Sequence, residues 1–287
     1  MNTYLVKSTG MIVALAMALA SCSGKKDATQ QDVAATDTVA IEGVEILPLD
    51  DVTAVWLQDN AQEKLMPRTL FADAPDTLIE RLDLQDGIPS TISAFWVEAN
   101  GEHILFDTGI GAPDGKLMER LQAIGLTPAD VRYLYLTHLH GDHIGGMMRG
   151  DSVVFPNAEV YLAKAEYDAW MLMPADQNAQ AVATMEAYKE HLHLFAFGDT
   201  LPGGVCTIDA TGHTPGHTAY QVGSLLIVGD LMHGAALQIP YPEYCASYDM
   251  DKTKAVETRR RLMQYARDNK LTIAGMHLSA PAYLTND

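Results

Sequence analysis

The chain has 287 residues, of which 19 are Lys or Arg and 37 are Asp or Glu, so its formal net charge is −18. With 48% hydrophobic and 20% charged residues it has enough apolar material for a large core, which excludes collagen-like, coiled-coil and wholly disordered chains. So acidic a surface repels phosphate backbones, and we therefore expect no nucleic-acid partner.

Residues 1–21 have the pattern of a lipoprotein signal peptide. Lys7 precedes an apolar run from Met11 to Ala20, which is too short to span a bilayer and matches a signal-peptide core. The run leads into Leu19-Ala20-Ser21-Cys22, which resembles a bacterial lipobox in which Cys22 is acylated. We therefore expect a protein of the bacterial cell envelope, periplasmic or on the outer membrane, held to the membrane by a lipid on Cys22. Ordinary secretion with cleavage nearby is the alternative.

Residues 22–43 are rich in Ala, Thr, Asp and Gln and contain no aromatic residue, which predicts a flexible tether. From residue 44 to 287 there is no second linker and no internal repeat, so we expect one catalytic domain. Cys206 and Cys245 lie in this domain, and the sequence leaves open whether they pair or remain free thiols.

Apolar runs of strand length recur along this domain, most of them bounded by Gly, Pro, Asn or Asp. They are Val44–Pro48, Ile92–Glu98, Ile104–Phe106, Val131–Leu136, Val160–Ala163, Val205–Ile208, Ala219–Val222, Leu225–Val228 and Thr272–Met276. Apolar residues at three- and four-residue spacing predict helices over Pro113–Ile124, Lys164–Met173, Ala179–Leu194 and Lys252–Asn269. Many strands with helices between them indicate an α/β architecture with more than one sheet.

The ten histidines are the most informative feature of the sequence. Four residues that can bind metals fall within six positions: His138, His140, Asp142 and His143. Because they follow the predicted strand Val131–Leu136, His138 and His140 project to one side of an extended backbone. Gly141 then permits a sharp turn that directs the next two side chains toward a second point. Imidazole and carboxylate are zinc ligands, so this segment predicts a metal site.

The segment His138-x-His140-x-Asp142-His143 resembles the signature of the metallo-β-lactamase superfamily. Further motifs follow in matching order: Phe106-Asp107-Thr108-Gly109, Gly212–Thr218, Gly229-Asp230 and His277. The resemblance extends from about residue 44 to 280. It implies a four-layer αβ/βα sandwich, in which two mixed sheets pack face to face beneath outer helices and the metals lie at one edge.

The resemblance also implies two divalent ions, with zinc expected and Mn, Fe or Co as alternatives. Its first metal would take the ligands His138, His140 and His217. Its second metal would take Asp142, His143 and His277. Asp230 would bridge the two ions. His213 is expected to support its turn through hydrogen bonds, and Asp107 to support the ligand loop.

The bridging Asp230 argues against β-lactam hydrolysis. The stretch Gly229–Gln238, with Tyr248-Asp249-Met250-Asp251, resembles the subgroup that contains methyl parathion hydrolase and secreted lactonases. In that subgroup an Asp-x-Asp segment leads into an Arg-rich helix, as Asp249–Arg261 does here. We expect this helix to serve mainly in packing.

The expected activity is a dinuclear-zinc hydrolase that opens a small, neutral lactone, such as an acyl-homoserine lactone, or cleaves a related ester. A metal-bridging hydroxide would be the nucleophile. The residues assigned to catalysis are Asp142, Asp230 and His233. Asp230 or His233 would return a proton to the leaving alkoxide. His233 stands where acyl-homoserine lactonases of the superfamily often have a catalytic Tyr, so the Tyr-assisted variant of the reaction is not expected.

Two alternatives remain open at this point. The first is hydrolysis of organophosphate triesters or other esters on the same fold. The second, from another class, is a membrane-tethered binding lipoprotein with an inactive metal site, although the complete ligand set argues against it. The sequence also leaves open whether the chain forms a homodimer.

Overall fold

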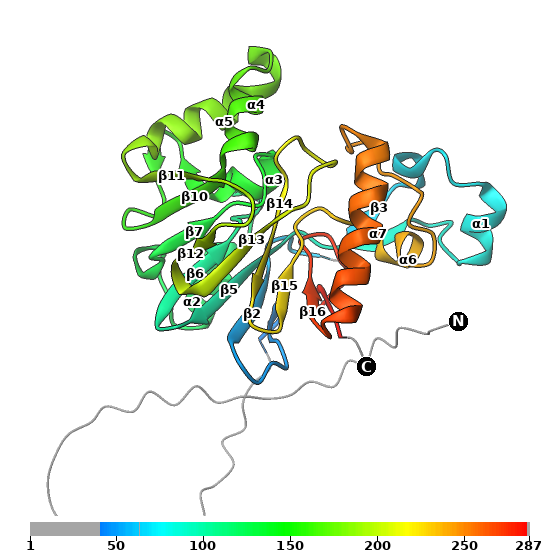
Figure 1. Ribbon diagram of the computed structural model, residues 1–287, viewed down its shortest axis with the longest axis horizontal. Coiled ribbons are helices and arrows are strands. Elements are labelled where there is room, and N and C mark those ends of the chain that lie inside the picture. Colours follow the sequence, from blue (N-terminus) through cyan, green and yellow to red (C-terminus); the bar gives the residue numbers. More distant parts are fainter. Residues whose placement is uncertain (1–40, 63, 286–287) are drawn as a thin grey trace, which may run out of the picture.

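The computed structural model describes residues 41–62 and 64–285 (Figure 1). The signal peptide expected at residues 1–21, the lipid site at Cys22 and most of the tether at 22–43 lie outside this part of the chain. Among the described residues, no helix combines the length and the apolar character needed to cross a membrane.

The first of two large sheets has seven strands. In spatial order they are β1 (Val44–Ile46), β2 (Thr53–Gln58), β5 (Ser93–Ala99), β6 (Glu102–Phe106), β7 (Tyr133–Tyr135), β10 (Glu159–Ala163) and β11 (Leu192–Phe195). Neighbouring strands are antiparallel from β1 to β6 and parallel from β6 to β11. Side chains alternate between the faces, so Trp56 joins the core between the sheets while Val55 and Leu57 join the core beneath the helices.

The second sheet has six strands. Their order is β12 (Thr200–Leu201), β13 (Val205–Asp209), β14 (Thr218–Val222), β15 (Leu225–Ile227), β16 (Thr272–Ala274) and β17 (Tyr283–Leu284). Only β15 and β16 are parallel neighbours. The two sheets pack through aromatic rings, and the buried Tyr220 hydroxyl donates a 2.6 Å hydrogen bond to the Leu136 carbonyl.

Helices cover the outer faces of both sheets (Figure 1). The first sheet is covered by α2 (Leu117–Ala123), α4 (Lys164–Met171) and α5 (Ala175–Ala187). The second sheet is covered by α7 (Lys252–Asp268), whose N-terminus is capped by the Asp251 carboxylate. The expected sandwich of two mixed sheets with outer helices is confirmed.

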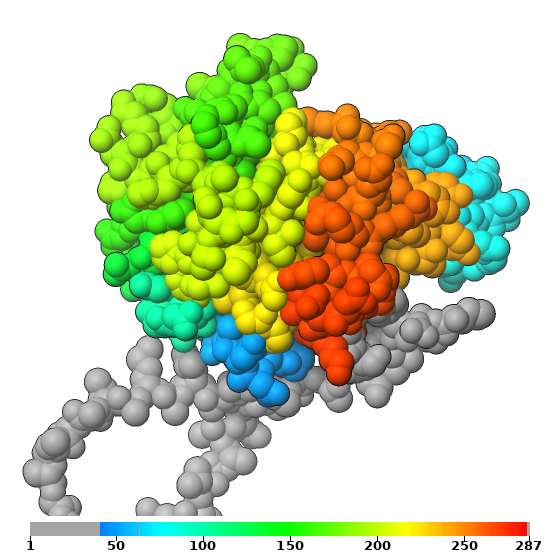
Figure 2. All heavy atoms as spheres, viewed as in Figure 1, coloured from blue at the N-terminus to red at the C-terminus, as the bar shows by residue number. Residues whose placement is uncertain are grey.

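A smaller lobe packs beside the segment around α6 (Ala235–Gln238), where it forms one flank of the molecule (Figure 2). It contains β3 (Lys64–Met66), β4 (Ile88–Ser90), a 3₁₀ turn over Arg68–Phe71 and α1 (Asp76–Arg81). Its apolar cluster includes Phe71 and Ile79 and is completed by Leu237 of α6.

The remaining short elements are α3 (Gly141–Ile144), β8 (Met148–Arg149) and β9 (Ser152–Val153), with 3₁₀ turns at Pro128–Asp130, Gly145–Met147, Lys189–His191 and Pro202–Gly204.

The helix predicted over Ala179–Leu194 is wrong after Ala187. Helix α5 ends at Ala187, and Leu192–Phe195 forms strand β11, which pairs in parallel with β10. Apolar spacing alone does not separate these two states, and here pairing with a buried strand outweighs the helical pattern. Cys206 is exposed and Cys245 is buried, and both are free thiols.

Asp59, directly after β2, holds the loop that follows β6 in place through hydrogen bonds. Its buried carboxylate accepts hydrogen bonds from the backbone N–H groups of Ile110, at 2.7 Å, and Leu117, at 2.8 Å. Gly109 has a φ of 69°, and a Cβ at this position would lie 2.2 Å from Asp59 Oδ2. This close approach requires glycine.

We predict that Asp59→Ala lowers the free energy of unfolding by about 2–4 kcal/mol, because two buried N–H groups lose their acceptor. Chemical denaturation measures the change. The control Asp50→Ala removes an exposed aspartate and should change stability by less than about 0.5 kcal/mol. Equal stability of the Asp59→Ala and unsubstituted chains would contradict the role of Asp59.

Candidate metal centre

Five loops that follow strand ends meet at one edge of the sandwich. They carry Asp107 after β6, residues 138–143 after β7, His213 after β13, Asp230 after β15 and His277 after β16. Parallel neighbours place their carboxyl ends at the same edge, which brings β6 next to β7 and β15 next to β16. The edge therefore collects most of the predicted metal ligands.

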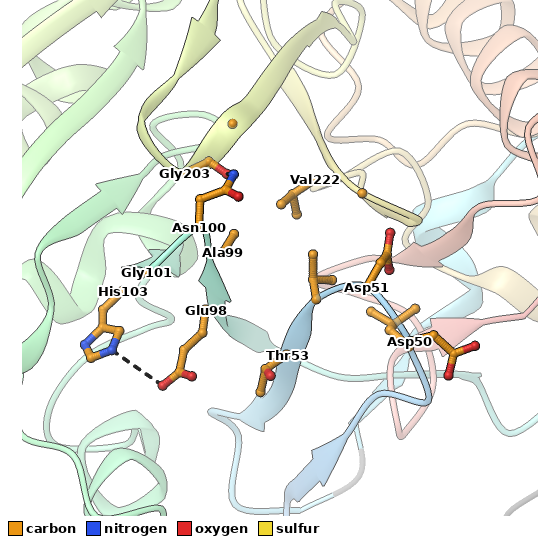
Figure 3. A pocket seen from close by; sticks show the side chains of 14 residues that line it. Asp50, Asp51, Thr53, Glu98, Ala99, Asn100, Gly101, His103, Gly203 and Val222 are labelled. Carbon is orange, nitrogen blue, oxygen red and sulfur yellow. Dashed lines mark hydrogen bonds and ion pairs between the residues drawn. The ribbon is translucent and has the colours of Figure 1, made fainter.

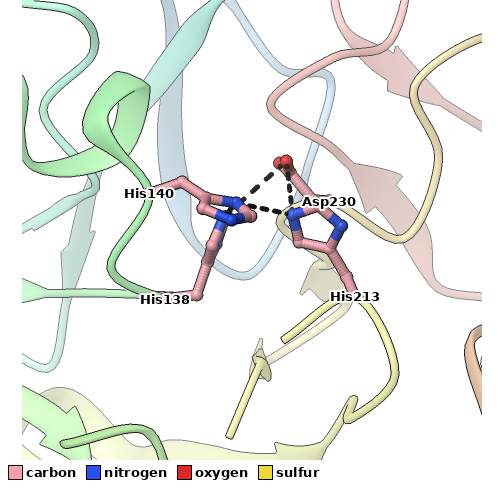
Figure 4. Close-up of side chains that lie close together, drawn as sticks. All are labelled: His138, His140, His213 and Asp230. Atoms are coloured by element: carbon pink, nitrogen blue, oxygen red, sulfur yellow. Dashed lines mark hydrogen bonds and ion pairs between the residues drawn. The ribbon is translucent and has the colours of Figure 1, made fainter. Parts of the chain in front are cut away.

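The first group of donors consists of His138, His140, His213 and Asp230, and one ligand atom of each lies within 4.8 Å of the others (Figure 4). Nδ1 of His140 lies 2.9 Å from Nε2 of both His138 and His213. Oδ2 of Asp230 lies 3.2 Å from Nε2 of His213. Three imidazoles and a carboxylate thus converge on one point, as they do around a bound cation.

The second group consists of Asp142, His143 and His277. Nε2 of His277 lies 3.3 Å from Asp142 Oδ2. Asp230, a member of the first group, also contacts the second, because its Oδ1 is 3.1 Å from Nε2 of His143 and its Oδ2 is 3.3 Å from Nε2 of His277. Gly141 begins the short helix α3, which carries Asp142 and His143, and the ring centroid of His143 also lies 4.0 Å from that of His138 in the first group.

Two unpartnered atoms test whether this site suits a metal. Nε2 of His143 and Oδ1 of Asp230 are buried 3.1 Å from each other, and neither has a partner with hydrogen-bond geometry among the described residues. Burying such atoms unpaired is costly, so native proteins seldom do it without an ion or a water to satisfy them. Imidazole nitrogens and carboxylate oxygens are ligands for zinc and other divalent ions. The residues therefore fit divalent metal ions.

The charges of the site depend on one another. Burial lowers the pKa of His143 and His277, but nearby carboxylates, Asp230 foremost, outweigh it. The pKa of His277 rises to about 10, and that of His143 rises well above its ordinary value. Burial raises the pKa of Asp230, yet the surrounding histidines lower it well below its ordinary range. Without ions, protons on the histidines therefore balance the carboxylates, and bound cations would replace those protons.

The structure exchanges the roles expected for His213 and His217. Nδ1 of His217 donates to the Ala210 carbonyl at 3.0 Å, and its Nε2 accepts the backbone N–H of Asp230 at 3.1 Å. Both ring nitrogens are thus engaged, and His217 holds the backbone of Asp230 instead of joining a donor group. Gly229 has a φ of 52°, and a Cβ there would lie 2.4 Å from Nε2 of His217. His213, expected only to support its turn, lies in the first group.

Asp107 supports the ligand loop as the resemblance implies. Its carboxylate accepts hydrogen bonds from the backbone N–H of Thr137 at 2.8 Å and from the Thr137 hydroxyl at 2.7 Å. It also accepts the Nδ1–H of His143 at 2.7 Å. Asp107 has a φ of 58°, an uncommon value for a residue other than glycine, and these bonds hold it there.

Glu166 is a supporting residue that the sequence analysis missed. Its side chain lies at the start of α4 and is fully buried. It accepts the backbone N–H of Leu139 at 3.1 Å, the Thr214 hydroxyl at 2.8 Å and the backbone N–H of Gly216 at 2.7 Å. Burial raises its pKa and these hydrogen bonds lower it, with burial prevailing. Glu166 thus ties the loop of His138 to the loop of His213, and no motif marks it among the other acidic residues.

His233 lies against both groups without belonging to the predicted ligand set. Its Nε2 is 3.1 Å from Asp230 Oδ2, its ring stacks on His277 with centroids 5.3 Å apart, and its buried Nδ1 has no partner among the described residues. The half-exposed ring of Tyr248 lies 5.7 Å from it. The side chain of Asp142 is 31% exposed, so the site opens to solvent beside this residue.

A pocket of about 520 Å³ opens elsewhere, at the opposite end of β5 (Figure 3). Its lining includes three acidic side chains: Asp50, Asp51 and Glu98. The other end of β5 follows Thr91, whose carbonyl accepts a 2.8 Å hydrogen bond from Nδ1 of His277. The strand therefore separates this pocket from the metal donors, and its lining contains none of the predicted site residues.

Comparison with known proteins supports the same family. Residues 87–269 match the metallo-beta-lactamase superfamily, and the chain belongs to it. The N-acyl homoserine lactonase AiiB of Agrobacterium fabrum is 26% identical over 232 residues, which cover 65% of this chain and 79% of AiiB. The N-acyl homoserine lactonase AttM of the same organism is 28% identical over 120 residues, which cover 38% of this chain and only 42% of AttM.

Two solved structures have the same fold. The dizinc quorum-quenching lactonase AidC, in complex with a homoserine product, aligns with a TM-score of 0.76 and 25% identity, covering 84% of this chain and 92% of AidC. The hydrolase AbOPH of the beta-lactamase superfamily aligns with a TM-score of 0.74 and 30% identity, covering 85% of this chain and 93% of AbOPH. Together with the donor groups, these similarities identify the chain as a metal-dependent hydrolase.

The exchange of roles between two histidines can be tested directly. We predict that His213→Gln, which removes a donor of the first group, lowers the zinc content of the purified protein by about one ion per chain. His217→Gln should keep the zinc content and lower the unfolding temperature, because His217 bonds only to backbone groups. Elemental analysis and thermal unfolding measure the two effects. Zinc loss in His217→Gln with none in His213→Gln would restore the assignment made from sequence.

Proposed function

We propose that the chain is a dinuclear zinc hydrolase that opens neutral lactones, with acyl-homoserine lactones as the preferred class. The observation that carries the proposal is the position of Asp230, whose carboxylate contacts both groups of donors. Its Oδ1 lies beside His143 of the second group, and its Oδ2 lies beside His213 of the first group and His277 of the second. The similarity to the lactonases AiiB and AidC supports the substrate class. The lipid expected on Cys22 would hold this activity at the cell envelope.

The metal ligands in this proposal follow the two donor groups. His138, His140 and His213 would hold one ion, and Asp142, His143 and His277 the other, with Asp230 shared. When bound, divalent ions polarise a substrate oxygen and make water a stronger nucleophile at neutral pH. The donor set also suits Mn, Fe or Co.

His233 supplies a proton in this proposal. Burial lowers its pKa despite the opposing effect of Asp230, so the imidazole is neutral and carries a single N–H. A proton on Nε2 is shared with Asp230 Oδ2 at 3.1 Å, next to both donor groups. The neutral imidazole would take up the proton that water releases as it attacks the carbonyl, at the unpartnered Nδ1, and the resulting imidazolium would return a proton to the alkoxide that leaves when the lactone ring opens.

The surroundings favour an uncharged substrate with an apolar part. The formal charge of −18 repels anions at long range. Close to the metal donors, Tyr248 lies beside His233, and the residues Tyr248 and Met250 are each 47% exposed. A substrate that enters beside Asp142, the 31% exposed carboxylate of the second group, would find apolar contact at Tyr248 next to His233.

A substrate panel tests the proposal. We predict that the zinc-loaded protein releases one proton for each N-hexanoyl homoserine lactone that it opens, at a higher kcat/KM than for phosphotriesters, thioesters or β-lactams. Asp230→Ala should lower kcat/KM at least about 100-fold, because both donor groups lose their shared carboxylate, and even loss of a ligand's outer partner commonly costs 10- to 100-fold. The control Asp50→Ala lies in the opposite pocket and should retain full activity.

The outcomes of the panel separate the alternatives. Faster turnover of phosphotriesters would replace the lactonase with a phosphotriesterase. A protein that binds zinc and hydrolyses none of these substrates would contradict the proposed function and favour a binding lipoprotein.

The role of His233 gives a separate prediction. We expect His233→Gln to lower kcat by about 100-fold, in the range of general acid catalysis, with KM and zinc content unchanged. Steady-state kinetics and elemental analysis measure these quantities on the same preparation. Loss of zinc from this variant would show that His233 is a ligand and not a proton donor.

A further inference from the structure

One buried carboxylate outside both donor groups faces a histidine of the metal centre. Asp249 lies between α6 and α7, its residue is 5% exposed, and its Oδ1 is 3.0 Å from Nδ1 of His213. We infer that Asp249 is a positioning residue, which holds His213 with Nε2 directed at the other metal donors. The inference rests on the metal centre proposed above, and it is independent of which substrate the enzyme takes.

The chemistry of the pair determines where the proton lies. An ionised carboxylate only accepts hydrogen bonds, so Nδ1 of His213 must donate to Asp249. A neutral imidazole has one N–H, which leaves the lone pair on Nε2. This Nε2 is the atom that lies 2.9 Å from Nδ1 of His140. Asp249 therefore selects the tautomer of His213 that can bind a cation.

The backbone on both sides of this contact is fixed as well. The N–H of Met250 donates to the His213 carbonyl at 3.0 Å, and the N–H of Asp251 donates to the Gly212 carbonyl at 2.9 Å. Asp249 therefore cannot shift without moving the loop that carries His213. Two backbone hydrogen bonds therefore support the contact between the side chains of Asp249 and His213.

Arg259 of α7 supplies the opposite charge and links this segment to Asp230. Its side chain is buried, with Nη2 3.4 Å from Oδ2 of Asp249. Its Nε donates to the carbonyl of Leu231, the residue after Asp230, at 2.8 Å. A buried carboxylate needs such a partner, and here the same guanidinium also fixes the loop of the shared ligand. Helix α7, expected mainly to pack, thus also stabilises the metal loops.

The arrangement repeats one found in the second donor group. Asp107 accepts Nδ1–H from His143 at 2.7 Å, just as Asp249 accepts it from His213. Each group therefore contains one histidine that is backed by a carboxylate. Such partners orient the ring and raise the basicity of the ligand, and their loss commonly weakens metal binding 10- to 100-fold.

A matched pair of variants tests the role of Asp249. We expect Asp249→Asn to weaken zinc binding about 10- to 100-fold, measured by competition with a chromophoric chelator. The control Asp251→Asn lies two residues further on, and its affinity should stay within about two-fold because Asn also caps helices well. Unchanged affinity in Asp249→Asn, or equal loss in both variants, would overturn the inference while leaving the proposed function intact. If the unsubstituted chain bound no zinc, the inference and the proposed function would fail together.

A second measurement covers the case in which Asp249→Asn does not fold. Long-range ¹H–¹⁵N spectra of the zinc-loaded, unsubstituted protein report the tautomer of each histidine, and the His213 signals are identified by their loss in His213→Gln. We expect a proton on Nδ1 of His213 and none on Nε2. A proton on Nε2 would overturn the inference.

Discussion

The burial of one carboxylate among imidazoles is the constraint on which the rest of the site depends. Asp230 is almost fully buried, and five imidazole nitrogens lie within 3.7 Å of its two oxygens, from His138, His143, His213, His233 and His277. A charged group in such a place is tolerated only when opposite charge compensates it. The surrounding histidines can compensate it by taking up protons, and in the proposed function bound cations would compensate it instead.

The fold meets this constraint by fixing the loops that carry the donors with hydrogen bonds from other parts of the chain. Their loops follow strand ends, and their outer atoms are held by groups from distant parts of the chain. Asp107 and Asp249 orient two histidines, while Glu166 joins two ligand loops. His217 fixes the backbone of Asp230 itself. Rigid donors favour binding and catalysis because little reorganisation is needed when ions or substrate arrive.

Local patterns in the sequence predicted much of this arrangement. Apolar runs predicted the central strands of both sheets. The spacing of residues 138–143 predicted four of the side chains that lie together as metal donors. The sequence did not separate His213 from His217, because both lie in one glycine-rich turn, and the three-dimensional path places the ring of His213 among the other donors. Glu166 and Asp59 were missed because their partners are backbone amides far away in sequence, which no periodicity reveals.

Anomalous scattering at the zinc edge, recorded from crystals of the zinc-loaded protein, tests the central claim most directly. The account predicts two peaks per chain that share Asp230, one bound by His138, His140 and His213 and the other by Asp142, His143 and His277. Ligand distances should be about 2.0–2.2 Å. An absence of peaks between these residues, or a single peak that Asp230 does not contact, would contradict it.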